Sequence, residues 1–441
     1  MKRIAAALFL LIPALPTFAQ EEGDSFDDLF EGEILEEEGE QAQEEGYGED
    51  LFEEPARKET PEEAAPEEAF LVSEQLEWGG SFDLTLTTQV AWGGYPVPWK
   101  SQFWQEGVSS LSSRLAADLF FDARPDRNFR VFGKVKAAYQ YPEDWDVEIF
   151  ELFSDFQLND LLFFRVGKQT VQWGVGYFFS PADVLNLVSI DPEEPEAQRE
   201  GPIAIKTHFP FAAHNAYLYL VADDIDKLYE IAVAPKLELL LGNYELGIGG
   251  FYQTDLTPKG MLTLTGPLWD LDLFAEAMIQ WGSDRTFYAA AGDPPPNKDG
   301  LLVSGTAGFS YLNSDWNLSL FAQYFFNGQG YLSYEYLTLQ GVAATGADTL
   351  YPGRHYLAAS IGWSELLDSD FSVSVLYLGS FSNQSGSGLI TPTFTWEPID
   401  HVSFSTGFSF SYGYGNGGNE YAPIGGSLAY TFSASLGGGR F

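Results

Sequence analysis

Charged and polar side chains fall at alternate positions in several stretches of the first half of the chain. In an extended strand this spacing places them on one face. Arg130, Lys134 and Lys136 share such a face, opposite an apolar one. Charged groups along a water-filled path discriminate between ions at the points where a passing ion loses part of its hydration shell. We therefore predict a basic stripe made of Arg114, Arg130, Lys134, Lys136, Arg165 and Gln169.

A second stripe is acidic. Asp270, Asp272 and Glu276 alternate with apolar residues, which places the three carboxylates on one face of a later strand. If the two stripes line opposite walls of one aqueous path, they create a transverse field that sets ion selectivity. The alternative is that these charges only solvate a wet interior or pair with charges on neighbouring strands.

The segment from Trp173 to Gly201 is long for a hairpin connection, and long ordered loops are usually functional. Its charged residues are candidates for a constriction. Folded inward, it would narrow the path and set its carboxylates opposite Arg165 and Arg199; placed outside, it would be a surface loop. The sequence leaves both placements open. The predicted constriction residues of this loop are Asp183, Asp191 and Arg199.

Catalytic and metal chemistry find little support in the sequence. The chain has no cysteine and four histidines. His208 and His214 flank an apolar, turn-like stretch, and two imidazoles without a third ligand are more often turn residues than a metal site. No phosphate-binding glycine loop opens a helix. We expect no catalytic residue, cofactor or metal, and a barrel hydrolase that uses a histidine is the weaker alternative.

Strands are the elements that must position these side chains. From Trp78 onward the residues alternate, as in 402–412, where even positions are mostly apolar or aromatic and odd ones small and polar. Aromatic residues make up 16% of the chain, as expected where rings sit at two water–lipid boundaries. Strands in a membrane must close into a cylinder to satisfy their backbone groups. We predict an all-β fold over residues 71–441, a transmembrane antiparallel up-and-down β-barrel, with a soluble all-β exported protein as the alternative.

The number of strands follows from counting the alternating stretches. Seventeen candidates of about ten residues are separated by turn-rich gaps. Because single-chain bacterial barrels have an even number of strands, we predict about sixteen, within a range of 14–18. The longer gaps around 293–297 and 340–348 are rich in small and turn-forming residues and are predicted to be external loops.

The amino-terminal part has a different composition. Lys2 and Arg3 precede an apolar run that ends in a small-residue cleavage pattern before Gln20, so residues 1–19 are predicted to be a signal peptide. Residues 20–69 hold 22 acids and 2 bases, and we predict a disordered acidic leader over residues 20–70 that plugs or tethers the barrel from the periplasm, or is only a linker. A net charge of −42 argues against binding to nucleic acid or anionic lipid surfaces.

The carboxyl end resembles the signal that the barrel-assembly machinery reads in outer-membrane proteins. The last residue is the aromatic Phe441, which implies the assembly machinery as a partner. The apolar residues before it, from Leu428 to Leu436, lie in the other phase of the alternation. This mismatch predicts either a bulge in the run of glycines at 437–439 or a divergent signal.

A stretch in the middle of the chain resembles a porin-like group of bacterial outer-membrane barrels. The similarity covers about forty residues and consists of Arg165 to Gln169, Trp173 to Gly176, Ser180 to Asp183, Asn186, Asp191–Pro192 and Arg199 to Gly201. The acidic leader, with Asp-Leu-Phe-Glu at 28–31 and 50–53, is similar to exported proteins of spirochaetes. The resemblance implies an outer-membrane barrel that contacts lipid. Porins are usually trimers, so the resemblance also makes a homo-oligomer a possible partner.

We therefore expect a passive diffusion channel for small hydrophilic solutes or ions in the cell outer membrane. The alternative is a barrel without a channel that acts as a surface adhesin or structural anchor through its loops. Measurement of conductance distinguishes the two.

Overall fold

The computed structural model describes most of the chain from Leu76 onward. The described residues are 76–94, 107–126, 128–141, 145–158, 161–223, 225, 227–285, 287, 299–331, 351–367, 369–381, 385–415, 420–422 and 426–440. The predicted signal peptide and acidic leader, the two predicted external loops at 293–297 and 340–348, and Phe441 lie outside these residues. Among the described residues, no helix is long and apolar enough to cross a membrane.

The described part consists of eighteen strands and one short 3-10 helix, η3 (Leu228–Glu230). The strands are β1 (Leu76–Gly93), β2 (Val108–Asp126), β3 (Phe129–Tyr141), β4 (Trp145–Leu158), β5 (Leu162–Lys168), β6 (Ile203–Phe211), β7 (His214–Val221), β8 (Ala232–Leu241), β9 (Tyr244–Phe251), β10 (Lys259–Leu268), β11 (Leu271–Trp281), β12 (Leu301–Asn313), β13 (Leu318–Phe326), β14 (His355–Trp363), β15 (Phe371–Phe381), β16 (Ser385–Ile399), β17 (Val402–Gly415) and β18 (Ser427–Arg440).

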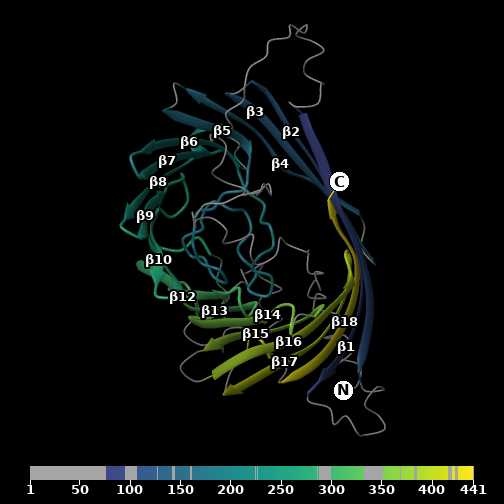
Figure 1. Cartoon of the computed structure of the whole chain (residues 1–441). Helices are drawn as coiled ribbons and strands as arrows, with labels where there is room; N and C mark the ends of the chain where they lie inside the picture. The colour runs from purple at the N-terminus through teal and green to yellow at the C-terminus, as the bar shows by residue number, and fades with distance from the viewer. Residues whose placement is uncertain are drawn as a thin grey trace.

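Every strand pairs antiparallel with its neighbours in sequence, and β1 also pairs with β18, which closes the sheet (Figure 1). This confirms the predicted antiparallel barrel. The predicted number of about sixteen strands is wrong, because the barrel has eighteen. β10 is the strand that matches none of the predicted candidates. Its alternation over Met261–Thr265 is interrupted by Gly266 and Pro267, a pair of residues typical of turns.

The outer face of the barrel is apolar over the middle of the strands and aromatic at both ends. Outward side chains such as Leu86, Leu264 and Ile361 are exposed. Large exposed rings lie near the short turns (Trp78, Trp269, Trp316) and near the opposite ends of the strands (Trp145, Tyr252, Trp281). An apolar band between two aromatic girdles is the surface that membrane barrels present to lipid.

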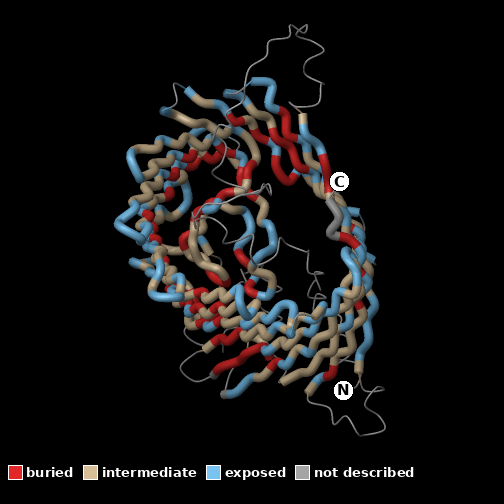
Figure 2. The backbone as a smooth tube through the Cα atoms, in the orientation of Figure 1, coloured by how far each residue is buried: buried red, intermediate tan, exposed pale blue. Residues whose placement is uncertain are grey.

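The connection between β5 and β6 covers one part of the inner face of the barrel. Residues 169–202 of this connection run inside the barrel (Figure 1). Inward side chains beneath it, such as Ala204, Ala234 and Ala358, are buried, whereas inward side chains of β17 and β18, such as Ser405 and Ser433, are only half-buried (Figure 2). The inner face is therefore packed under the inward connection and less covered at these positions of β17 and β18.

The predicted bulge near the carboxyl end is confirmed. Gly437 pairs with Asp83, while Gly439 pairs with Phe82, so one residue of β18 is left without an opposite partner. A bulge of this kind shifts the alternation of side chains by one position. Residues after the bulge are therefore out of phase with the alternation of Leu428 to Leu436.

Candidate functional site in the barrel lumen

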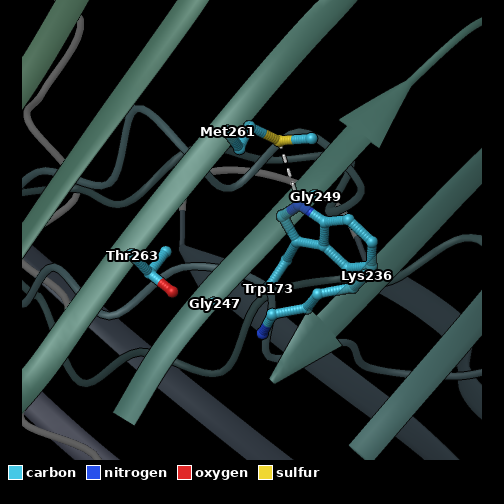
Figure 3. Close-up of a pocket in the computed structure, with 6 residues that line it drawn as sticks. All are labelled: Trp173, Lys236, Gly247, Gly249, Met261 and Thr263. Atoms are coloured by element: carbon cyan, nitrogen blue, oxygen red, sulfur yellow. Dashed lines mark hydrogen bonds between the residues drawn. The ribbon is translucent and has the colours of Figure 1, made fainter. Parts of the chain in front are cut away.

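The inward loop, residues 169–202, is anchored first by Trp173. Its indole lies flat over β9 at Gly249, where a Cβ atom would be 3.2 Å from the ring (Figure 3). The ring nitrogen donates a hydrogen bond to the sulfur of Met261 at 3.0 Å, and the Lys236 ammonium lies 5.5 Å from the ring centre. Tyr219 of β7 packs against the ring edge. Glycine in β9 thus makes room for the largest buried side chain of the loop.

Apolar contacts extend this anchor on both sides. Val171, Ala182 and Leu185 of the inward loop form one buried cluster with inward residues of β6 to β11. Phe178 and Phe179 form a second cluster with inward residues of β13 to β16. Because the inward residues in these two clusters are apolar and buried, this part of the interior is a packed core rather than a wet surface. The structure therefore places the predicted constriction loop inside the barrel.

The second anchor is the buried carboxylate of Glu276, which lies on β11. It accepts hydrogen bonds from the backbone N–H groups of Val175, of Gly176 at 2.6 Å and of Ala182 at 2.9 Å. It also accepts one from the Ser180 hydroxyl at 2.9 Å. These donors belong to the Trp-Gly-Val-Gly and Ser-Pro-Ala-Asp motifs, which the sequence alone did not connect with Glu276.

The third anchor is Gln323 on β13. Its amide oxygen accepts hydrogen bonds from Phe178 N at 2.7 Å and Phe179 N at 3.3 Å. Its amide nitrogen donates to Phe179 O and to the Thr306 hydroxyl, both at 2.6 Å. The three anchors hold the loop against the wall from β9 to β13.

The predicted basic stripe on β2 to β5 is instead a ladder of alternating acids and bases. Asp122 accepts from Arg130 at 2.8 Å, and Arg130 lies 3.8 Å from Asp155. Arg165 makes two hydrogen bonds to Asp155, at 2.8 and 3.2 Å, and its guanidinium lies 4.0 Å from the Phe153 ring centre. Each base is thus compensated by a carboxylate on the next strand.

The remaining bases of the stripe also have partners. The Lys134 ammonium lies 3.1 Å from Asp118 and donates to Gln198 of the inward loop at 2.8 Å. Lys136 lies 3.9 Å from the Phe150 ring centre. Arg114 faces inward from β2, beside Thr85 of β1. The wall therefore favours the alternative in which inward charges pair across neighbouring strands.

Two predicted constriction residues pair with each other rather than with the wall. Asp183 is buried and accepts hydrogen bonds from Arg199 and from Asn186, the latter at 2.9 Å. Gln169 is also buried and donates to the Ala204 carbonyl at 3.1 Å. These residues stabilise the fold of the inward loop. Of the two arginines that the loop carboxylates were predicted to face, Arg199 pairs with Asp183, whereas Arg165 pairs with Asp155 of β4.

The predicted acidic stripe is spread over three environments. Asp270 is exposed in the turn between β10 and β11, and Asp272 is exposed next to that turn. Glu276 is covered by the inward loop. The three carboxylates are in phase along the sequence, but they do not form one continuous charged face of the passage.

Exposed acids occur instead at the tip of the inward loop, which we define as residues 191–198. Asp191, Glu193 and Glu196 are exposed there. Within the described part of the chain, none of these three carboxylates forms an ion pair with a lysine or arginine. Tyr177 donates a hydrogen bond to Glu196 at 2.7 Å. Of the predicted site residues, only Asp191 belongs to this group.

The less covered wall of the lumen is lined by hydroxyl groups. Inward positions of β17 and β18 carry Ser, Thr, Ala and Gly. Hydroxyls pair across strands, as in Thr87 with Ser433 at 3.0 Å and Thr395 with Ser405 at 3.1 Å. The inward wall of β17 and β18 is therefore uncharged, and most of it is half-buried.

The histidines make separate contacts. His208 bonds to Asn215 at 2.9 Å, and His214 accepts a hydrogen bond from the backbone N–H of Leu240 at 3.1 Å. In the part of the chain that the structure describes, no group of three His, Asp or Glu side chains is arranged to hold a metal ion.

Comparison with known proteins gives similarity of structure only. No protein-family profile matches the chain, and no curated protein is similar to it in sequence. OccAB1 of Acinetobacter baumannii is 10% identical, with a TM-score of 0.48 over 82% of this chain and 96% of that one. OccK8 (OprE) of Pseudomonas aeruginosa is 8% identical, with a TM-score of 0.49 over 82% and 98%. The outer membrane protein OpdK of the same organism is 8% identical, with a TM-score of 0.47 over 82% and 99%.

Proposed function

We propose that the chain is a porin-like channel of the outer membrane, through which small hydrophilic solutes or ions diffuse passively. One observation carries this proposal: the inward loop packs against inner-wall residues from β6 to β16, whereas most inward positions of β17 and β18 are only half-buried. A packed, plugged barrel would bury both parts of the inner wall. The apolar outer face and aromatic girdles support placement in a membrane.

The exposed charges of the passage favour cations over anions. The ladder on β2 to β5 is compensated, whereas the loop tip presents Asp191, Glu193 and Glu196 to the lumen. Carboxylates at a narrow point attract cations and repel anions where both lose water. This refines the predicted transverse field, because the acidic side of the field is the loop tip rather than β11.

We expect purified protein in planar lipid bilayers to conduct ions with a preference for cations. The triple variant Asp191→Asn, Glu193→Gln, Glu196→Gln should lose most of this preference, as measured by the reversal potential in a salt gradient. The matched control is Asp270→Asn, which removes an acid from the turn and should leave the reversal potential unchanged. Absence of conductance in the wild type would contradict the channel.

Neutralising a base of the ladder should change the preference for cations in the opposite direction. In Lys134→Gln, Asp118 loses the ammonium 3.1 Å away and becomes an uncompensated acid near the passage. The preference for cations should then increase rather than fall. A reversal potential that moves toward anions would contradict this prediction, because loss of a positive charge cannot favour anions.

Selectivity should also depend on pH near neutrality. Although water reaches Glu193, the surrounding protein partly desolvates its carboxylate, and this desolvation, followed by the Asp191 charge, raises the pKa of Glu193 to about 7. A carboxyl group is neutral below its pKa and charged above it, so the loop tip loses negative charge as the pH falls through this value. We expect the preference for cations to fall between about pH 8 and about pH 6, well above the usual range of a glutamate.

The Glu193→Gln variant provides the control for this pH dependence. It should show a weaker preference for cations at high pH and no step near neutrality. Desolvation also raises the pKa of Glu196, but Glu196→Gln should keep the step that belongs to Glu193. A step that persists unchanged in Glu193→Gln would assign the titration to another group.

The partners predicted from the ends of the chain remain proposals. The bulge at the glycines of β18 supports recognition of the carboxyl end by the assembly machinery, because one extra residue shifts the phase of the positions that follow it. The acidic leader joins the barrel at Leu76, which pairs with Ala123 next to a short turn of β2. Unchanged conductance and assembly after deletion of residues 21–69 would remove its proposed role as a plug or tether.

A further inference from the structure

We propose that Glu276 is the positioning residue that sets the width of the passage, because it holds the inward loop against the wall. This inference rests on the channel proposed above. Glu276 was expected from its sequence position to be an exposed acid of the lumen, yet its side chain is 4% exposed. Its role follows from what it binds rather than from its charge toward solutes.

The carboxylate is bound almost entirely by the backbone of the loop. Both oxygens accept hydrogen bonds, and three of the four donors are peptide N–H groups of Val175, Gly176 and Ala182. In the described part of the chain, no lysine or arginine forms an ion pair with Glu276. The loop itself therefore compensates the buried charge, and loop and carboxylate stabilise each other.

The local sequence of the loop is shaped for this contact. A Cβ atom on Gly174 would lie 2.6 Å from the Glu276 carboxylate and 1.9 Å from the Ser180 hydroxyl. A Cβ atom on Gly176 would lie 2.0 Å from the Phe179 carbonyl. The backbone can wrap around the carboxylate only because these two positions lack side chains.

Because of its position along the loop, this contact can determine the width of the passage. The loop leaves the wall at β5, and Glu276 binds it at β11, between the Trp173 anchor and the Gln323 anchor. The acidic loop tip begins at Asp191, after residues 183–190, in which Leu185 and Ile190 are also buried. If residues 174–182 detach from β11, the loop tip can move toward the hydroxyl-lined wall or away from it, and the width of the passage is no longer fixed.

Replacing Glu276 with glutamine or with aspartate distinguishes its role as a hydrogen-bond acceptor from its role in filling space. Glu276→Gln has nearly the same shape, but its NH₂ group faces hydrogen-bond donors and cannot accept from them. Glu276→Asp keeps two accepting oxygens on a shorter side chain. If Glu276 acts by accepting from the loop, the aspartate variant should retain much of the function and the glutamine variant should not. A side chain that only fills space would give the reverse order.

Release of the loop can be measured without reference to conduction. The chain has no cysteine, so Leu185→Cys introduces a single thiol at a loop position that is 3% exposed. In this background we expect Glu276→Gln to raise the rate of labelling by a water-soluble thiol reagent at least about tenfold, since a charge-assisted hydrogen bond contributes about 1.5–3 kcal/mol. Glu276→Asp should give a smaller increase.

Asp272→Asn is the matched control, because it lies on the same strand and face but next to the turn. It should leave the labelling rate unchanged. Resistance of the unboiled barrel to detergent denaturation checks that each variant is closed. Equal labelling rates in Glu276→Gln and the Leu185→Cys parent would overturn the proposal.

Single-channel recording of the same variants links the loop to the passage. We expect Glu276→Gln to give larger and more variable currents than the wild type, and Glu276→Asp to give currents close to it. Faster labelling with unchanged currents would show that Glu276 holds the loop but does not set the width, which overturns the proposal. If the wild type does not conduct, the channel itself fails, while the labelling result still decides whether Glu276 holds the loop.

Discussion

Replacing Asp155 with alanine is expected to lower the free energy of unfolding by about 3–5 kcal/mol, the cost of breaking a buried ion pair by removing one partner. Asp155 is 3% exposed and connects two strands, because it makes two hydrogen bonds to Arg165 and lies 3.8 Å from Arg130. Without it, Arg165 keeps its place above the Phe153 ring but loses this carboxylate. Denaturant unfolding from lipid vesicles, followed by tryptophan fluorescence, measures the change.

Asp270→Ala is the control for this prediction. This acid is exposed in a turn, and surface substitutions away from special contacts change stability by less than about 0.5 kcal/mol. If Asp155→Ala were as stable as Asp270→Ala, the ladder on β2 to β5 would be a set of solvated charges with no structural role. The interpretation of the compensated wall would then be wrong, and its bases would be available to act on passing anions.

Trp173→Ala is expected to have an effect of similar size, about 3–5 kcal/mol, as is typical when a large buried aromatic side chain is removed. Trp173 is 1% exposed, and it contacts Tyr219, Gly249 and Met261 on three strands. The space left by the indole cannot be refilled by a glycine-containing strand. The loop therefore loses its attachment near β9, while the closed ladder of the wall remains.

The two parts of this result can be separated by experiment. Unfolding from vesicles reports the total loss, and labelling of the single thiol in Leu185→Cys reports exposure of the loop. Leu187→Ala is the control on the same loop, because Leu187 is exposed and its truncation should change stability by less than about 0.5 kcal/mol. A Trp173→Ala protein with a protected thiol would show that Glu276 and Gln323 are sufficient to hold the loop.

The general architecture could be predicted from the sequence because it depends on a local pattern. Alternation such as that in β17 specifies which side chains face lipid, and strands of this kind in a membrane can satisfy their backbone groups only by closing into a barrel. The bulge in β18 was also predictable, since the apolar residues from Leu428 to Leu436 are out of phase with Phe441 and three glycines lie between them. The strand number was not, because Gly266 and Pro267 in β10 resemble a turn and only pairing with β9 and β11 identifies the strand.

One feature of the sequence indicates that the loop lies inside the barrel. At the start of β8, Ala232 and Ala234 face inward and Val233 outward, so both faces of this part of the strand are apolar. A wet lumen would require polar residues at the inward positions. Apolar side chains on both faces indicate that something covers the inner face, and the inward loop is what covers it.

The sequence by itself determined the barrel class, the two faces of its strands and the residues available to line an interior. Tertiary structure alone decided which inward charges are exposed, because pairing depends on the register between strands and on where a long loop lands. Asp155 and Glu276 are both inward acids by periodicity, yet one compensates arginines of neighbouring strands and the other binds backbone N–H groups about a hundred residues away in sequence. Such contacts are set by closure of the sheet in space, which has no counterpart in local spacing.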